Sequence, residues 1–181
     1  MCILAPKMID CSHHPNVQLL TYSEVKEVTG STGNFVVKIL RKPRFVDESK
    51  CTGCGICAQH CPVEVPNEFD ANLGMRKAIY MPFPQAVPRA MTVDKENCLE
   101  CGLCAKMCEA KAVDLKQQPQ EVELNVGAVI VAIGFDIFDP SEIPSYGYGR
   151  YKNVVTALEL ERLLCASGPT GGHLIRPSDG K

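Results

Sequence analysis

The sequence predicts an α+β protein in which a cysteine-rich module of two similar halves is inserted between flanking segments of a different kind. Two observations predict this arrangement. Eight of the 11 cysteines fall into two tight groups with the same spacing. The segments on either side instead have the apolar patterns of strands and of one helix. We therefore expect three parts, at residues 1–43, 44–117 and 118–181.

The first flanking segment is expected to form a β-hairpin. Residues 22–29 and 35–40 alternate between apolar and polar side chains, and Leu19–Leu20 could begin a further strand. The intervening stretch, 30–34, contains two glycines, which is typical of a hairpin turn. The hairpin has no group of cysteines and therefore differs in kind from the module that follows.

The last segment is expected to contribute a buried strand and a helix. Residues 122–133 predict one long strand or two shorter ones, because 128–133 are continuously apolar, as in a strand that is covered on both faces. Residues 154–164 predict a helix with Asn153 as its N-cap. Its apolar face would carry Ala157, Leu160 and Leu164.

Composition excludes several classes of protein. The net charge of −2 indicates neither a nucleic acid nor an anionic membrane surface as partner. The longest apolar run has ten residues, 126–135, too few for a membrane span. The first ten residues lack the pattern of a signal peptide, and an odd number of clustered cysteines fits disulfide bonding poorly. We expect a reducing, cytoplasmic location.

An internal repeat organises the middle of the chain. Residues 46–61 and 93–108 align without a gap, and both read V-D-x-x-x-C-x-x-C-G-x-C-A-x-x-C. The two copies are 47 residues apart, counted from Cys51 to Cys98. Two similar units predict a module with approximate two-fold symmetry.

The spacing of the repeated cysteines is typical of [4Fe–4S] clusters, in which each iron needs one soft, anionic thiolate ligand. In two-cluster ferredoxins the fourth cysteine of each run binds the other cluster. Applied here, this pattern assigns cluster one to Cys51, Cys54, Cys57 and Cys108, and cluster two to Cys98, Cys101, Cys104 and Cys61. Pro62 follows Cys61 as the pattern requires, whereas Glu109 follows Cys108 and departs from it. The expected function is electron transfer, with no catalytic residue in the chain.

Three alternatives remain open at this stage. A zinc-stabilised interaction module is disfavoured, because structural zinc sites usually take two C-x-x-C pairs from separate loops. An independent soluble electron carrier of the ferredoxin type would need neither the hairpin nor the buried strand. The 36-residue spacer between Cys61 and Cys98 either covers the clusters or forms a docking surface for a partner.

Five further stretches resemble the A-type iron–sulfur flavoprotein subunit of heterodisulfide reductase and its bacterial homologues. They are residues 2–8 (CILAPKM), 19–25 (LLTYSEV), 82–88 (PFPQAVP), 168–172 (GPTGG) and 176–181 (RPSDGK). The resemblance covers essentially all 181 residues. It implies a thioredoxin-reductase-like FAD domain into which the ferredoxin module is inserted, with the FAD fingerprint upstream of this chain.

The resemblance also implies roles for two residues outside the repeat. Residues 129–134 are similar to the strand and turn that approach FAD in such reductases, with Ile133 where threonine is usual, so Gly134 is a possible FAD contact. Cys2 is a possible ligand of a further cluster in the full-length protein. The family relays electrons among FAD, clusters and partner subunits, which include hydrogenase or other electron-donor subunits, and flavin-based electron bifurcation occurs in such complexes.

Overall fold

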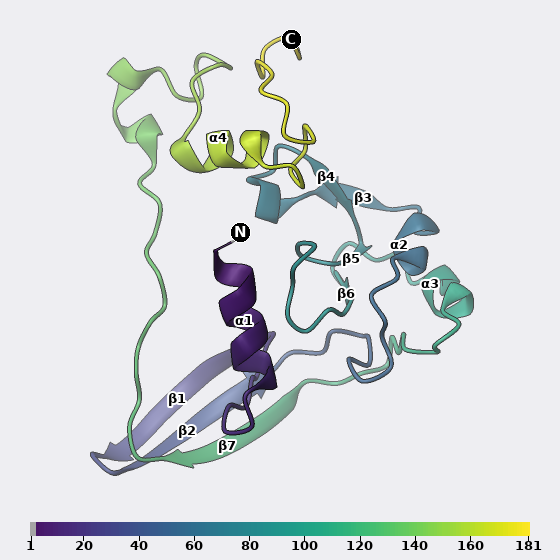
Figure 1. Cartoon of the computed structure of the whole chain (residues 1–181), viewed down its shortest axis with the longest axis vertical. Helices are drawn as coiled ribbons and strands as arrows, with labels where there is room; N and C mark the ends of the chain where they lie inside the picture. Colours follow the sequence, from purple (N-terminus) through teal and green to yellow (C-terminus); the bar gives the residue numbers. More distant parts are fainter. Residues whose placement is uncertain (1–2) are drawn as a thin grey trace. The chain divides into compact units, whose positions relative to one another are not determined.

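The computed structural model describes residues 3–181, so Cys2 lies outside the described residues. The chain combines helices and strands, as expected (Figure 1). Its internal contacts divide it into two compact units. The first contains the residues up to Val63 together with Lys77–Val131, and the second contains Glu64–Arg76 and Ala132–Lys181.

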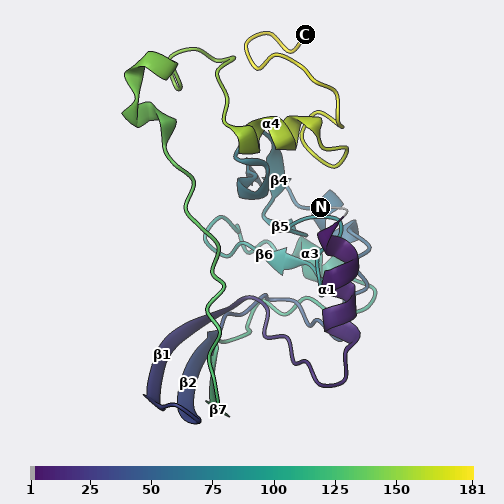
Figure 2. The same cartoon turned by 60° about the vertical axis from the view of Figure 1, so that its left-hand side comes forward.

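The first unit contains a three-stranded antiparallel sheet in the order β1-β2-β7 (Figure 2). The strands are β1 (Ser23–Ser31), β2 (Asn34–Arg41) and β7 (Gln120–Val126). β1 and β2 confirm the predicted hairpin. Gly33 in its turn has a φ of 86° and donates its N–H to the carbonyl of Gly127 at 3.0 Å. The hairpin thus joins the N-terminal part of the chain to the segment that follows the cysteine repeat.

The predicted long strand ends earlier than expected. β7 stops at Val126, and residues 127–139 form neither helix nor strand in the structure (Figure 1). Ile130, Ile133 and Phe135 are each 91% exposed. The prediction failed because a strand exists only where a neighbour supplies hydrogen bonds, and no described strand pairs with this stretch.

Near the N-terminus one strand prediction was wrong and one helix was missed. Leu19–Leu20 is not a strand. The helix α1 (Leu4–His13) was not predicted at all, and none of its residues is buried. Pro6 is compatible with the helix because it lies in the first turn, where its missing N–H costs nothing.

The cysteine repeat folds into two halves of the same plan. After each group of three closely spaced cysteines comes a short helix, α2 (Ile56–Gln59) in the first half and α3 (Leu103–Met107) in the second. The two helices lie side by side (Figure 1). The two-fold plan predicted from the repeat is therefore present in the backbone.

The two halves exchange their extended segments. Val46, which begins the first half, pairs with Val113 at the end of the second. Conversely, β6 (Thr92–Val93) begins the second half and pairs with β5 (Ile79–Tyr80) at the end of the first. The Asp47 N–H donates to Ala112 O, and the Asp94 N–H to Ala78 O, both at 2.7 Å. Each half is thus completed by the other.

The hydrophobic core of the module lies between the two halves. Its buried members are apolar residues and two cysteines, namely Val46, Cys57, Ile79, Met91, Val93, Cys104 and Ala112. Cys51, Cys61, Cys98 and Cys108 are partly buried and pack against it. The cysteines are therefore part of the core itself.

The second unit combines a piece of the spacer with the C-terminal segment. The spacer contributes β3 (Glu64–Pro66), a 3-10 turn at Glu68–Asp70 and β4 (Met75–Lys77), and the two strands pair. The C-terminal segment contributes 3-10 turns at Pro140–Glu142 and Pro144–Tyr146, followed by α4 (Ala157–Leu164).

The helix predicted at 154–164 is confirmed as α4, but its N-cap is not Asn153. Thr156 caps it in a reciprocal arrangement: Thr156 Oγ1 accepts from the Glu159 N–H at 3.2 Å, and Glu159 accepts from the Thr156 N–H at 2.6 Å. Asn153 instead accepts from the Ser178 N–H at 3.0 Å. The Thr-x-x-Glu signal of a capping box is present in the sequence and gives the correct start.

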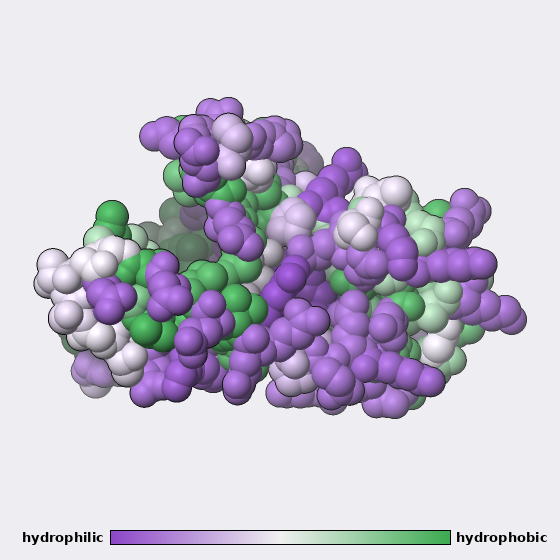
Figure 3. Space-filling view, turned by 90° about the horizontal axis from the view of Figure 1, so that it is seen from below, coloured by the Kyte–Doolittle hydropathy of each residue, from purple (hydrophilic) through white to green (hydrophobic). Residues whose placement is uncertain are grey.

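Apolar side chains also reach the surface. Figure 3 shows apolar patches between hydrophilic side chains on one face. Large hydrophobic residues that are more than half exposed include Val25, Leu99, Val131 and Leu174.

Candidate metal centres

Each cysteine loop has the same unusual backbone. Gly55 and Gly102 precede α2 and α3 with φ values of 80° and 73°. Two residues after the first cysteine of each run, Gly53 and Glu100 also have positive φ, at 65° and 53°. These left-handed positions turn the chain so that successive cysteines face the same side of the loop.

The structure brings the first predicted set of cysteines together. Cys51, Cys54 and Cys57 line a cavity of about 190 Å³, and Cys108 from the second half completes its lining. The rest of the wall is largely apolar and includes Val46, Ile56, Met91, Met107, Ala112 and Val113. Four thiols thus share one largely apolar cavity, and one of them comes from the other half of the repeat.

The second predicted set is arranged in the same way. Cys98, Cys101 and Cys104 line a smaller cavity of about 20 Å³ together with Cys61, which comes from the first half. Apolar neighbours include Val63, Ile79, Val93, Leu99 and Leu103. The exchange of the fourth cysteine follows the exchange of the extended segments, because both place the end of one half against the other.

The two sets also match in burial. The third cysteine of each run, Cys57 or Cys104, is buried, whereas the second, Cys54 or Cys101, is exposed. Burial away from water raises the pKa of the Cys57 thiol to about 11, and it also raises the pKa of the Cys104 thiol. The Ile56 N–H and the Thr52 hydroxyl lower the pKa of Cys54. A metal bound at these sites would therefore displace protons from buried thiols.

Backbone N–H groups point at the sulfurs. Glu100 donates to Cys98 Sγ at 3.4 Å, and Ala112 donates to Cys108 Sγ at 3.3 Å. Hydrogen bonds of this kind stabilise the anionic sulfur and help to set the reduction potential of a bound cluster. The donor set and the repeated backbone therefore fit two thiolate-bound iron–sulfur clusters.

Of the residues singled out outside the repeat, Gly134, Cys11 and Cys165 line neither cavity. Gly134 is exposed, with a φ of 79°, in the stretch that follows β7. Cys2 is outside the described residues. Cys11 and Cys165 are free thiols in neither cavity. Within residues 3–181, no three His, Cys, Asp or Glu side chains are grouped as ligands of a single metal ion.

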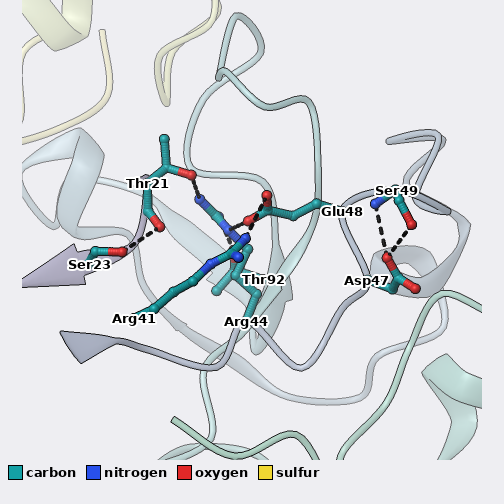
Figure 4. Close-up of polar contacts among 8 residues, drawn as sticks. All are labelled: Thr21, Ser23, Arg41, Arg44, Asp47, Glu48, Ser49 and Thr92. Atoms are coloured by element: carbon teal, nitrogen blue, oxygen red, sulfur yellow. Dashed lines mark hydrogen bonds and ion pairs between the residues drawn. The ribbon is translucent and has the colours of Figure 1, made fainter. Parts of the chain in front are cut away.

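One residue that supports the first loop was not singled out from the sequence. Arg44 is 9% exposed and precedes the first cysteine run. Its guanidinium donates to Glu48 at 2.6 Å, and to Thr92 and Thr21 at 2.9 Å each (Figure 4). Nothing in the local sequence distinguishes Arg44 from Arg41, which is half exposed. Its role depends on partners that are far away along the chain.

Gly53 and Gly55 allow a matched test of the first loop. Alanine at either position would have to adopt a positive φ, which costs about 1–2 kcal/mol. At Gly53 it would also lie 2.9 Å from side-chain atoms of Arg89 and Met81, whereas at Gly55 it would meet nothing within 4 Å. We expect Gly53→Ala to lose about 1–3 kcal/mol more than Gly55→Ala because of this overpacking. Thermal unfolding of the iron-loaded variants measures the difference, and equal losses would contradict it.

Two cysteine-lined cavities in a duplicated mixed helix–strand module define the class of an iron–sulfur protein of the ferredoxin type. Residues 44–67 match the family model "4Fe-4S binding domain". The particular resemblance is to the A-type subunit of heterodisulfide reductase, and comparison with known proteins confirms it over the whole chain.

The relatives include three proteins from methanogenic archaea. The chain is 67% identical to the second A-type iron–sulfur subunit of the CoB–CoM heterodisulfide reductase of Methanopyrus kandleri. It is 59% identical to the A-type subunit of the H2:CoB–CoM heterodisulfide,ferredoxin reductase of Methanothermobacter thermautotrophicus. It is 49% identical to the A-type subunit of the ferredoxin:CoB–CoM heterodisulfide reductase of Methanosarcina mazei.

Each of these matches covers 100% of this chain but only 23–28% of the relative. The chain thus spans about a quarter of the length of the heterodisulfide reductase subunits that it matches. Among the described residues, no helix is long and apolar enough to cross a membrane.

Proposed function

We propose that this chain is the electron-transferring part of an oxidoreductase subunit of the heterodisulfide reductase type. The observation that carries the proposal is the pair of four-cysteine sets, each assembled from both halves of the repeat. Bound there, [4Fe–4S] clusters would accept and donate single electrons. No residue of the chain is proposed to convert a substrate.

The chain's own residues would do three things for such clusters. The eight cysteines would hold them, with one ligand of each cluster supplied by the other half. The buried side chains of Val46, Ile79 and Val93 line the two cavities and would exclude water from them. The N–H groups that point at sulfur would stabilise the added negative charge.

In the longer protein we propose that these clusters relay electrons between FAD and partner subunits. The exposed apolar stretch at 129–137 supports contact with further parts of such a protein, since its large side chains are uncovered here. Gly134 within it would be the FAD contact, and Cys2 would be a ligand of a further cluster. Relatives named for H2 or ferredoxin make a hydrogenase-type donor and ferredoxin reasonable partners for this chain. Electron bifurcation and a cytoplasmic location belong to the same proposal.

The first test is anaerobic iron and sulfide quantification with EPR spectroscopy of the reduced protein. We expect about eight irons and eight sulfides per chain, with the spectrum of two interacting reduced [4Fe–4S] clusters. Zinc without labile sulfide, in a protein prepared anaerobically, would overturn the proposal in favour of a structural zinc module. An isolated brown protein that exchanges electrons with soluble reductases as fast as the full-length protein does would favour the independent carrier.

A further inference from the structure

The two halves of the repeat differ in the length of chain that follows their last cysteine. Ala78 and Ala112 are equivalent, because each accepts a 2.7 Å hydrogen bond from the aspartate that begins the opposite half. Ala112 follows the last cysteine of its half by 4 residues, but Ala78 follows Cys61 by 17. The first half therefore contains an insertion of 13 residues relative to the second.

This insertion packs with the C-terminal segment. Glu64–Arg76 has the length of the insertion and forms one compact unit with Ala132–Lys181. The corresponding stretch of the second half, from Cys108 to Ala112, lines the first cavity without any such insertion. The insertion is thus not needed to fold a cysteine loop of this kind, and it requires another explanation.

The contact between the insertion and α4 is centred on a buried ion pair. Asp70 is 6% exposed and accepts from Arg162 Nε at 2.9 Å, and Arg162 is 3% exposed. The guanidinium of Arg162 also lies 4.7 Å from the centre of the Phe69 ring. Arg162 Nη2 is buried without a hydrogen-bond partner among the described residues. A buried pair of this kind adds little net stability, but it strongly disfavours any arrangement that separates the two charges.

Further contacts fix the conformation of the insertion and its packing against the C-terminal segment. Arg76 donates two hydrogen bonds to the Glu68 carboxylate, at 2.7 and 2.6 Å, and so closes the insertion on itself. Asn67 Nδ2 donates to the second oxygen of Asp70 at 2.6 Å. A methyl group on Gly74 would lie 3.0 Å from Pro169 Cβ, so the backbone there packs tightly against the segment that follows α4.

We propose that residues 64–76 are a docking arm by which the cysteine-rich module binds the α4 segment of its own chain, with the Asp70–Arg162 pair fixing the register. The arm begins three residues after Cys61, so the contact with α4 is tied closely to a predicted cluster ligand. This inference rests on the proposed function only in assuming that the module binds iron–sulfur clusters. Residues 64–76 of the spacer would then bind α4 of the same chain.

The pseudo-symmetry supplies a direct experiment in the full-length protein. In a shortened variant, residues 62–77 are replaced by Glu-Ala-Lys, the sequence that joins Cys108 to Ala112. We expect unchanged iron and sulfide content, while hydrogen–deuterium exchange of the α4 amides accelerates by about tenfold or more. Unchanged exchange in α4 at full iron content would overturn the docking arm. Absence of iron from the unmodified protein would instead contradict the proposed function.

If the shortened protein loses iron, point variants test whether the Asp70–Arg162 pair holds α4 against residues 64–76. Arg162→Met leaves the sequence of the arm intact and is expected to accelerate exchange in both α4 and 64–76. Arg162→Met with Asp70→Asn should be no worse than either alone, because the two residues act as a pair. Arg176→Met is the matched control, since its ion pair with Asp179 is largely exposed in the same unit. Equal effects of Arg162→Met and Arg176→Met would contradict the register role of the pair.

Discussion

A protein in which Cys51 and Cys108 are both replaced by alanine should keep about four irons per chain, whereas one in which Cys51 and Cys61 are both replaced should keep almost none. The first pair lies in a single cavity, so its loss leaves the other set of four cysteines complete. The second pair takes one ligand from each cavity, so no complete set remains. Iron and sulfide content of the anaerobically purified proteins distinguishes the two results.

The design of this experiment separates the exchanged assignment from the simpler one. If each run of four cysteines held its own cluster, Cys51 and Cys61 would share a cluster and the results would be reversed. Double variants are preferable to single ones because a site with three cysteines can retain a partial cluster. Cys11→Ala is the control for loss of a thiol outside both sets, since Cys11 is exposed and lines neither cavity.

That these cysteines gather in two cavities could be predicted, because the spacing typical of cluster ligands is visible in the sequence. Three cysteines that bind one compact object from a single loop are separated by two residues each, and the loop favours glycine at left-handed positions such as Gly55 and Gly102. The exchange of extended segments leaves no visible pattern in the sequence. β5 and β6 are two residues long, too short for any periodic pattern, and their pairing is decided by packing between halves that are distant in sequence.

Outside the repeat, whether an apolar segment forms a strand depends on which segments lie beside it. The hairpin was predicted because β1 and β2 are adjacent in sequence and joined by a glycine turn. The apolar run after β7 was expected to be a buried strand, yet Val131 and Ile133 are exposed because no described strand lies beside them. Composition indicates that a segment is suited to burial, but not what covers it. The match to only 23–28% of the length of longer relatives is consistent with a cover supplied from elsewhere.

The docking arm was hidden for a different reason. Residues 64–76 have little hydrophobic periodicity, and their main contact is an ion pair between residues 92 positions apart. Only the comparison of the two halves in three dimensions shows that Ala78 and Ala112 correspond. Once that correspondence is known, the length difference between the halves identifies the insertion from the sequence alone.

Replacing Arg44 with methionine should have the second-largest effect, a local destabilisation of about 2–4 kcal/mol. Methionine keeps much of the aliphatic volume but none of the donors. The substitution would remove the guanidinium that donates to the Thr92 hydroxyl and to the Glu48 carboxylate (Figure 4). Thr92 is only 1% exposed, so water cannot readily replace the lost donor. Because Arg44 also bonds Thr21, its loss should loosen the start of β1 from the cysteine-rich module.

Hydrogen exchange of two amides in the full-length, iron-loaded protein measures this effect. The Lys42 N–H bonds the Tyr22 carbonyl at 3.0 Å, and the Val93 N–H bonds the Arg44 carbonyl at 2.9 Å, so both report on the joint around Arg44. Exchange should accelerate by about thirtyfold or more in Arg44→Met, and by less in Arg44→Lys, which keeps the charge but lacks the fork of donors. Arg41→Met is the matched control, because its pair with Glu48 is half exposed and 3.3 Å long, and such pairs contribute less than about 1 kcal/mol. Equal exchange in Arg44→Met and Arg41→Met would show that the buried guanidinium does not join the sheet to the module, and the connection would then depend on the covalent chain and the apolar core.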